Sequence, residues 1–314
     1  MAGEARLYVS GYRGSEQRAA ARIPRFLNDR VGGAPAHAHH VRKPVPLLPT
    51  SGYNDPMDWD LPAIVLNTRP YGEGDVIVTL MTEEHGAHRG LARGGASRAQ
   101  GGLWQAGNFV QARWLARMSD QLGSFSGELI YATAASVMDD PLALGMLTAI
   151  CAQAEDALPE REPHEPVFSG LIRLLPRLAL GQVVLSELIM WETVLLADLG
   201  YGLDLAGCAV TGATEGLAFV SPKTGRAVTV EGAGIWSDRL LRLPSFMTGA
   251  AESGPEDWRD GLRLTGHFLA RDLFGGRHRP LPMAREMLYD RVAALVADST
   301  PAPGVPDLED RDAG

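Results

Sequence analysis

Apolar and polar residues alternate in short runs between residues 61 and 131, and glycine-rich segments separate the runs. Such alternation is typical of half-buried β-strands, because successive side chains point to opposite faces of a sheet. The pattern predicts an antiparallel sheet of five strands, at about residues 61–68, 75–81, 86–93, 107–117 and 121–131. The glycines of residues 94–102 predict a mobile loop between the third and fourth strands. Five short strands suit a small closed barrel of the OB type.

After residue 138 the apolar spacing changes to that of helices, which are predicted at about residues 141–158, 166–180, 182–199, 255–273 and 282–296. Asp139 or Asp140 can cap the first helix, and Pro141 fits its first position. Pro176 is expected to interrupt the last turn of the second helix. Several helices are apolar on more than one face, which favours simple core packing in a bundle; the alternative is a surface for a partner.

Between the third and fourth helices, two short runs at residues 203–212 and 217–229 predict a hairpin with Ser221–Gly225 as its tight turn. The chain is therefore predicted to be α+β. Residues 57–134 would form the OB-type barrel, and residues 135–300 an α-helical domain with the hairpin inserted at residues 204–232.

The two ends differ from the rest of the chain. Residues 1–56 hold eight basic and four acidic residues with several prolines and no sustained period, which predicts disorder. One interpretation is a basic arm that touches nucleic acid. The favoured alternative is that translation begins at Met57, and that residues 1–56 are not part of the natural protein. Residues 301–314 are predicted to be a disordered acidic tail.

Composition narrows the class of protein. With 29 basic and 38 acidic residues, the net charge of −9 argues against a histone-like coating of nucleic acid, but it leaves room for one basic face. Neither Cys151 nor Cys208 lies in a Cys-x-x-Cys pair, and no apolar run approaches the length of a membrane helix. A soluble, cytoplasmic protein with no membrane contact is expected.

A local cationic surface is the main candidate site. The segment from His85 to Ser119 holds five arginines and no acidic residue. Arginines that neutralise phosphates and aromatic rings that stack on bases are typical of single-strand binding. The predicted DNA-binding residues are Arg69, Arg89, Arg93, Arg98, Arg113 and Arg117. The aromatic residues among them fit the barrel core better when each is taken alone, and strand parity places Trp114 there: they are Trp104, Phe109, Trp114, Phe125 and Tyr131.

Catalytic and cofactor motifs are absent from the sequence. It contains no phosphate-binding loop, no dinucleotide fingerprint, no Gly-x-Ser-x-Gly and no His-Glu-x-x-His. The histidines at positions 85, 88, 164, 267 and 278 are scattered and are interpreted as surface residues. The prediction is therefore a protein that is not an enzyme, with no catalytic residue, metal or cofactor; an enzyme is the most distant alternative.

The order of residues Arg69–Asp75, Val76–Thr82, Glu84–Gly86 and Ala92–Gly95 resembles the N-terminal barrel of the RecO family of bacterial DNA repair proteins. The resemblance extends to about Val296. It implies a non-enzymatic recombination mediator that binds single- and double-stranded DNA, anneals complementary strands, engages SSB and joins RecR to help RecA load. It also implies a helical domain with an embedded zinc-ribbon-like hairpin.

The hairpin departs from the zinc-bearing members of that family, which carry two Cys-x-x-Cys pairs. Only Cys208 is present here, because Thr211, Thr229 and Gly232 stand at about the other three positions. A tetrahedral structural zinc needs four ligands. We therefore expect a hairpin without zinc, held by packing.

Net acidity supports a competing hypothesis. Residues 57–314 hold 21 basic and 34 acidic residues, a net charge of −13, which favours an OB-type protein-interaction adaptor without significant DNA affinity. In the mediator interpretation, apolar residues of the helical domain would dock SSB or RecR, on a face that the sequence does not identify.

Overall fold

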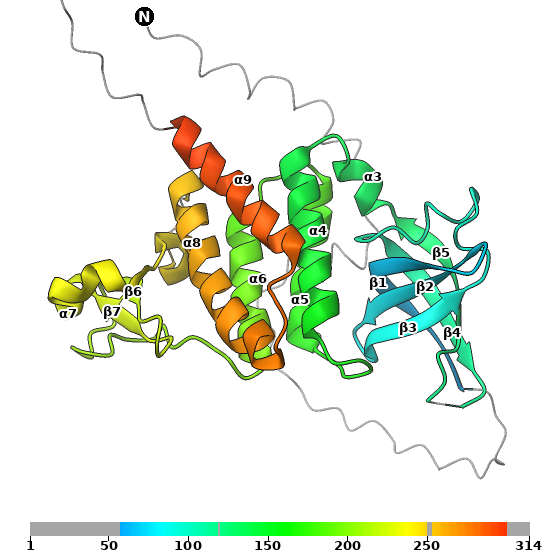
Figure 1. Ribbon diagram of the computed structural model, residues 1–314, viewed down its shortest axis with the longest axis horizontal. Helices are drawn as coiled ribbons and strands as arrows, with labels where there is room; N and C mark the ends of the chain where they lie inside the picture. The colour runs from blue at the N-terminus through cyan, green and yellow to red at the C-terminus, as the bar shows by residue number, and fades with distance from the viewer. Residues whose placement is uncertain (1–56, 119, 250–252, 300–314) are drawn as a thin grey trace, which may run out of the picture.

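The computed structural model places a five-stranded sheet at one end, a helical bundle in the middle and a small second sheet at the other end (Figure 1). It describes residues 57–118, 120–249 and 253–299. The predictions of disorder for residues 1–56 and 301–314 lie outside the described residues. The α+β class, with five strands followed by helices, is confirmed.

The strands of the first sheet are β1 (Met57–Tyr71), β2 (Asp75–Thr82), β3 (Gly86–Ala92), β4 (Phe109–Ala116) and β5 (Ser124–Tyr131). They form a closed barrel in the order β1-β2-β3-β5-β4. The long strand β1 pairs with β4 through its first half and with β2 through its second half. A short parallel pairing of β3 with β5, at Leu91 and Ala92, completes the ring.

Strand β1 begins four residues before its predicted start. Asp58 and Asp60 obscured this part of the strand, because aspartate is depleted in β-strands. In the barrel, both carboxylates serve β4 instead: Asp58 accepts from Arg113 at 2.9 Å, and Asp60 accepts from Gln111 at 2.5 Å. Between them, Trp59 stacks on Trp114 with 6.2 Å between ring centroids. The two acidic side chains thus stabilise the strand pair that the sequence pattern missed.

The helical part contains α3 (Thr133–Val137), α4 (Pro141–Ala157), α5 (Glu165–Ala179), α6 (Leu185–Asp198), α8 (Pro255–Phe268) and α9 (Met283–Ser299). Of the two predicted caps, Asp140 is the one that caps α4, because its carboxylate accepts from the backbone N–H groups of Leu142 and Ala143. The expected interruption at Pro176 is wrong. This residue lies close to the end of α5, so the proline removes one backbone donor and the helix continues to Ala179.

The helix predicted at 255–273 is α-helical only as far as Phe268. The chain then stays helical through the π-helical turn η3 (Leu269–Phe274) and the 3-10 turn η4 (Gly275–Arg277). Behind this helix, α9 supplies the fully buried Arg285, whose guanidinium donates to Glu192 of α6 and to the backbone oxygen of Leu262 in α8. One ion pair therefore joins three helices in the centre of the bundle.

The barrel and the bundle share one apolar core. Ile64, Leu66, Met81 and Phe109 of the barrel belong to the same buried cluster as the inward face of α4. Gly107, just before β4, lies so close to α4 that a Cβ atom there would stand 2.4 Å from a methyl carbon of Leu147. A separate cluster, whose residues alternate along the strands with these, fills the interior of the barrel; it includes Val65, Val78, Leu80, Trp104, Trp114 and Phe125.

The second sheet has three strands, β6 (Leu217–Val220), β7 (Ala227–Thr229) and β8 (Leu241–Arg242), in the order β7-β6-β8. The helical turns α7 (Val230–Ala233) and η1 (Gly234–Arg239) connect β7 to β8, and η2 (Ser245–Thr248) follows. The tight turn at Ser221–Gly225 is confirmed. Residues 203–212 do not form the first arm of the predicted hairpin, because both arms lie within residues 217–229.

Cys208 lies buried against this sheet, and its Sγ atom accepts the backbone N–H groups of Thr211 at 3.4 Å and Thr229 at 3.3 Å. In the described part of the chain, no group of three or more His, Cys, Asp or Glu side chains is placed to hold a metal ion. No helix of that part is long and apolar enough to cross a membrane.

Candidate functional site

The pairing of β1, β2 and β3 places Arg69 and Arg89 on one outward barrel surface, and Arg93 follows directly after β3 with the same parity as Arg89. Arg69 lies opposite Ile77, and Ile77 lies opposite Leu91, so these three side chains form one row across the strands. Arg89 follows in the neighbouring row, opposite Thr79. We call this surface the β1–β3 face, defined by Arg69, Tyr71, Ile77, Arg89, Leu91 and Arg93.

Arg98 is brought to the same end of the barrel by the loop after β3. The backbone N–H of Gly94 donates to the Asp75 carboxylate at 2.7 Å, and that of Ala96 donates to Gly74 O at 3.1 Å. These bonds tie the loop to the β1–β2 turn. Gly95 is required at this point, because a Cβ atom there would lie 2.4 Å from a methyl group of Val76. The prediction that the loop is mobile stays a prediction.

The predicted arginines differ in how much of their charge is compensated. Arg69 donates to Glu155 of α4 at 3.0 Å, Arg89 lies 3.9 Å from Glu160, and Arg113 donates to Asp58 at 2.9 Å. Across residues 57–118, 120–249 and 253–299, no carboxylate lies within 4 Å of the remaining three, Arg93, Arg98 and Arg117. The uncompensated charge of the β1–β3 face and its loop therefore comes from Arg93 and Arg98.

Arg113 in β4 and Arg117 just after its end lie apart from the β1–β3 face. Arg113 stands opposite Asp60 of β1 and Ser126 of β5 in the strand register. The six predicted residues therefore do not gather on a single surface. Their assignment to DNA binding stays a prediction, and the barrel offers at least two separate places for it.

Most of the aromatic residues named from the sequence are core residues. Trp104, Phe109, Trp114 and Phe125 are buried, and Tyr131 is half-buried. The interpretation of Trp114 as a core residue is confirmed. The exposed ring of the β1–β3 face is Tyr71, whose side chain is 55% exposed at the end of β1. The alternating pattern does not single out Tyr71, because this residue lies between the first two predicted strands; a tyrosine in a turn next to an arginine-rich segment is nevertheless a usable signal.

The interpretation of the histidines as surface residues is wrong for His88 and His164, which are both buried. His88 packs against the Trp114 ring with 4.6 Å between centroids, inside a cluster with Trp59 and Phe125. Burial, followed by the positive charges of Arg161 and the neighbouring His85, lowers the pKa of His88 to about 4. His88 is therefore a neutral core residue at pH 7.

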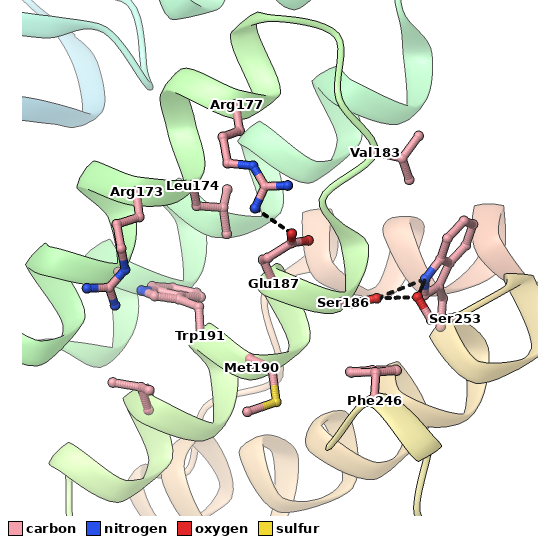
Figure 2. A pocket seen from close by; sticks show the side chains of 13 residues that line it. Arg173, Leu174, Arg177, Val183, Ser186, Glu187, Met190, Trp191, Phe246 and Ser253 are labelled. Carbon is pink, nitrogen blue, oxygen red and sulfur yellow. Dashed lines mark hydrogen bonds and ion pairs between the residues drawn. The ribbon is translucent and has the colours of Figure 1, made fainter. Parts of the chain in front are cut away.

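A pocket of about 970 Å³ opens between α5, α6, η2 and the start of α8 (Figure 2). Its apolar lining includes Leu174, Val183, Met190, Trp191, Val194, Phe246 and Trp258. Arg177 donates to Glu187 at 2.5 Å on its wall, and Ser186 and Ser253 accept from the Trp258 indole. We call this cavity the helical pocket.

Arg173 gives the helical pocket an uncompensated cation, since no carboxylate of the described residues lies within 4 Å of it. Figure 2 shows Arg173 and Arg177 on successive turns of α5 beside the apolar floor. The favoured interpretation of the helical residues, simple core packing, therefore holds for most of them but leaves this face open. The pocket has the apolar floor and polar edge that are common in binding sites.

Comparisons with known proteins agree over both parts of the chain. A family model described as "Recombination protein O N terminal" matches residues 57–133, and one described as "Recombination protein O C terminal" matches residues 138–281. A curated relative from Granulibacter bethesdensis is 58% identical over 76% of this chain and 97% of its own length, and is described as DNA repair protein RecO. Relatives with the same description from Gluconacetobacter diazotrophicus and Rhodospirillum centenum are 54% and 45% identical, over 76% and 79% of this chain and 96% and 100% of their own lengths.

Proposed function

Because the chain belongs to the RecO family of DNA repair proteins, we propose that it is a recombination mediator that binds single- and double-stranded DNA and anneals complementary strands. With RecR it would help RecA load on single strands covered by SSB. In this proposal residues 57–134 are an OB-type DNA-binding module, and residues 135–300 are a helical docking domain with the inserted hairpin at 204–232. The strand order β1-β2-β3-β5-β4 supports the OB type.

The observation that carries the DNA-binding proposal is the β1–β3 face with its loop. Arg93 and Arg98 flank the backbone bonds that tie the loop after β3 to the β1–β2 turn, and Tyr71 is exposed where that turn begins. No carboxylate of the described residues lies within 4 Å of either guanidinium. Guanidinium groups without ion-pair partners bind phosphates without first breaking a protein contact. An exposed ring beside them supplies the stacking surface that single-stranded DNA uses.

The test measures binding of the full chain to a labelled single-stranded oligonucleotide by fluorescence anisotropy at several salt concentrations. Replacing Arg93 and Arg98 together by alanine should weaken binding and reduce the slope of log K against log salt by roughly 1.4, since each lost phosphate contact on a single strand removes about 0.7. The control is Arg279→Ala, which removes an exposed arginine paired with Asp156 on the bundle. Equal slopes for both variants would place the DNA site elsewhere.

For the partner role, we propose that the helical pocket docks SSB or RecR. Met190→Asp would put a charge on the apolar floor, and Met287→Asp on α9 is the matched control, because Met287 is also exposed but does not line the pocket. Calorimetric titration with purified SSB and purified RecR should show that Met190→Asp weakens binding of one of them, with DNA affinity unchanged. If both variants bind both partners like the wild type, the pocket is not the docking site.

The adaptor hypothesis has one specific observation in its favour. Three of the six predicted DNA-binding arginines already face carboxylates, at Glu155, Glu160 and Asp58. The same anisotropy experiment decides between the two functions. No measurable binding to single-stranded DNA at low salt would support an adaptor without significant direct DNA binding.

A further inference from the structure

The hairpin unit, residues 217–242 with strands β6 to β8, α7 and η1, carries an exposed tryptophan. Trp236 lies in η1 with its side chain 54% exposed, and the preceding Ile235 is 88% exposed. Figure 1 shows that this unit projects from the bundle at the end opposite the barrel. Two adjacent exposed apolar side chains form a patch of the kind found at interaction sites, and an indole is highly buried on average.

The ring is accompanied by cations. The guanidinium carbon of Arg239 lies 4.8 Å from the centre of the Trp236 ring, and that of Arg242 lies 5.8 Å from the Phe219 ring. Among the residues that the structure describes, no carboxylate comes within 4 Å of either guanidinium. Both side chains therefore combine a planar stacking surface with a charge that is open to a phosphate.

The backbone that presents Trp236 is held in place before any ligand arrives. Thr229 caps α7 by accepting the N–H of Gly232 at 3.0 Å, and the buried Cys208 accepts the N–H groups of Thr211 and Thr229. The N–H of Leu240 donates to Ser237 O and ends η1. A preformed platform binds with little loss of conformational entropy.

We propose that the hairpin unit is a second contact for single-stranded DNA. One base stacks on the Trp236 indole, and Arg239 and Arg242 contact the neighbouring phosphates. This inference rests on the proposed DNA-binding function and extends it, because the unit lies far from the β1–β3 face and only a long strand reaches both. The protein then grips a strand at two separated points and fixes the path of the DNA between them.

A protein partner is the competing occupant, since Ile235 is aliphatic. The position of Arg239 over the indole favours DNA, because base and guanidinium planes both stack on aromatic faces and Arg239 keeps its charge for phosphate. DNA and a protein partner predict different effects when Ile235 is replaced. DNA needs the ring at position 236 and tolerates loss of Ile235, whereas an apolar protein surface uses both side chains.

The experiment compares two oligo-dT strands, one of roughly 10 nucleotides, within the span of one OB-type site, and one of roughly 50 nucleotides. Wild-type full-length protein is compared with Trp236→Ala, Trp236→Phe and Ile235→Ala, after circular dichroism has shown that all are folded. Trp236→Ala should lower affinity for the long strand by about 5- to 150-fold, the range expected for one lost base stack, and leave the short strand unchanged. Trp236→Phe should restore most of the loss, and Ile235→Ala should bind like the wild type.

An unchanged affinity of Trp236→Ala for the long strand would overturn this inference and leave the barrel site intact. Equal losses on both strands would also overturn it, because the effect would then not come from a second contact. A loss with Ile235→Ala as large as with Trp236→Ala would assign the patch to apolar docking instead. If the wild type binds neither strand, the proposed DNA-binding function fails together with this inference.

Discussion

Removal of one member of the buried Arg285–Glu192 pair should destabilise the helical bundle strongly. Arg285 is 1% exposed and Glu192 is 0% exposed, so neither charge reaches water when its partner is lost. Arg285→Met leaves an uncompensated carboxylate between α6, α8 and α9. Breaking such a pair costs about 3–5 kcal/mol, against the roughly 5–15 kcal/mol that stabilises a whole domain.

The double variant Glu192→Leu with Arg285→Met distinguishes the cost of the unpaired charge from the cost of lost packing. It removes both charges and fills the space with apolar atoms, which is often neutral or stabilising. The hydroxyl of Thr265 loses Glu192 as an acceptor, but it can donate its hydrogen to Gly261 O at 3.0 Å instead. The Leu262 carbonyl loses its donor from Arg285, which costs about 1 kcal/mol. The double variant should therefore be much more stable than either single variant.

The assay is urea unfolding followed by circular dichroism at 222 nm, with free energies compared at equal m-values. The control is Arg226→Met, which breaks the exposed pair with Asp204 and should cost less than about 1 kcal/mol. If Arg285→Met costs no more than Arg226→Met, the Glu192 carboxylate is not held unpaired in the bundle core, which contradicts this prediction. Additive losses in the double variant would refute it as well, because they would show no coupling between the two side chains.

Three further expectations follow from single positions. The folded-state pKa of His88 is lowered from 6.5 to about 4, so the neutral ring contributes its full stabilisation above pH 6.5. The free energy of unfolding should fall by at most about 3 kcal/mol as the pH drops to 4. Thermal melts of His88→Phe should not show this pH dependence. Gly86→Ala should cost more than about 3 kcal/mol, because its Cβ would meet the Glu162 carbonyl, whereas Gly72→Ala, with a similar positive φ and open space, should cost only about 1 kcal/mol. Elemental analysis of purified protein should find no stoichiometric zinc; one zinc per chain would overturn the expectation of a hairpin without metal.

The main elements of the fold could be predicted because they depend on local periodicity. The five strands and the long helices follow the alternation and the helical spacing of their own residues, and Asp140 caps α4 as expected. Strand β8 was missed because two residues carry no period, and the first residues of β1 were missed because their aspartates pair with β4. Such features depend on a partner strand that the local pattern does not contain.

The candidate site was predictable as a composition of residues but not as a surface. The arginine-rich segment without acidic residues is visible in the sequence. The carboxylates that neutralise Arg69 and Arg89, however, are those of Glu155 near the end of α4 and Glu160 in the loop after it. The burial of His88 and the opening of the helical pocket also depend on tertiary packing. The sequence therefore indicates which residue types could bind DNA, and the fold shows which of these side chains have no ion-pair partner among the described residues.

The continuous core between barrel and bundle has a mechanical consequence. Two modules joined by a flexible linker would have no fixed distance or orientation relative to each other. Here Leu147 of α4 packs against the backbone at Gly107, and the barrel residues Ile64 and Phe109 lie in the cluster of the bundle. The β1–β3 face and the helical pocket therefore lie on one continuously packed body. In the proposed function, the fixed separation between them would set how far a bound strand lies from a docked protein.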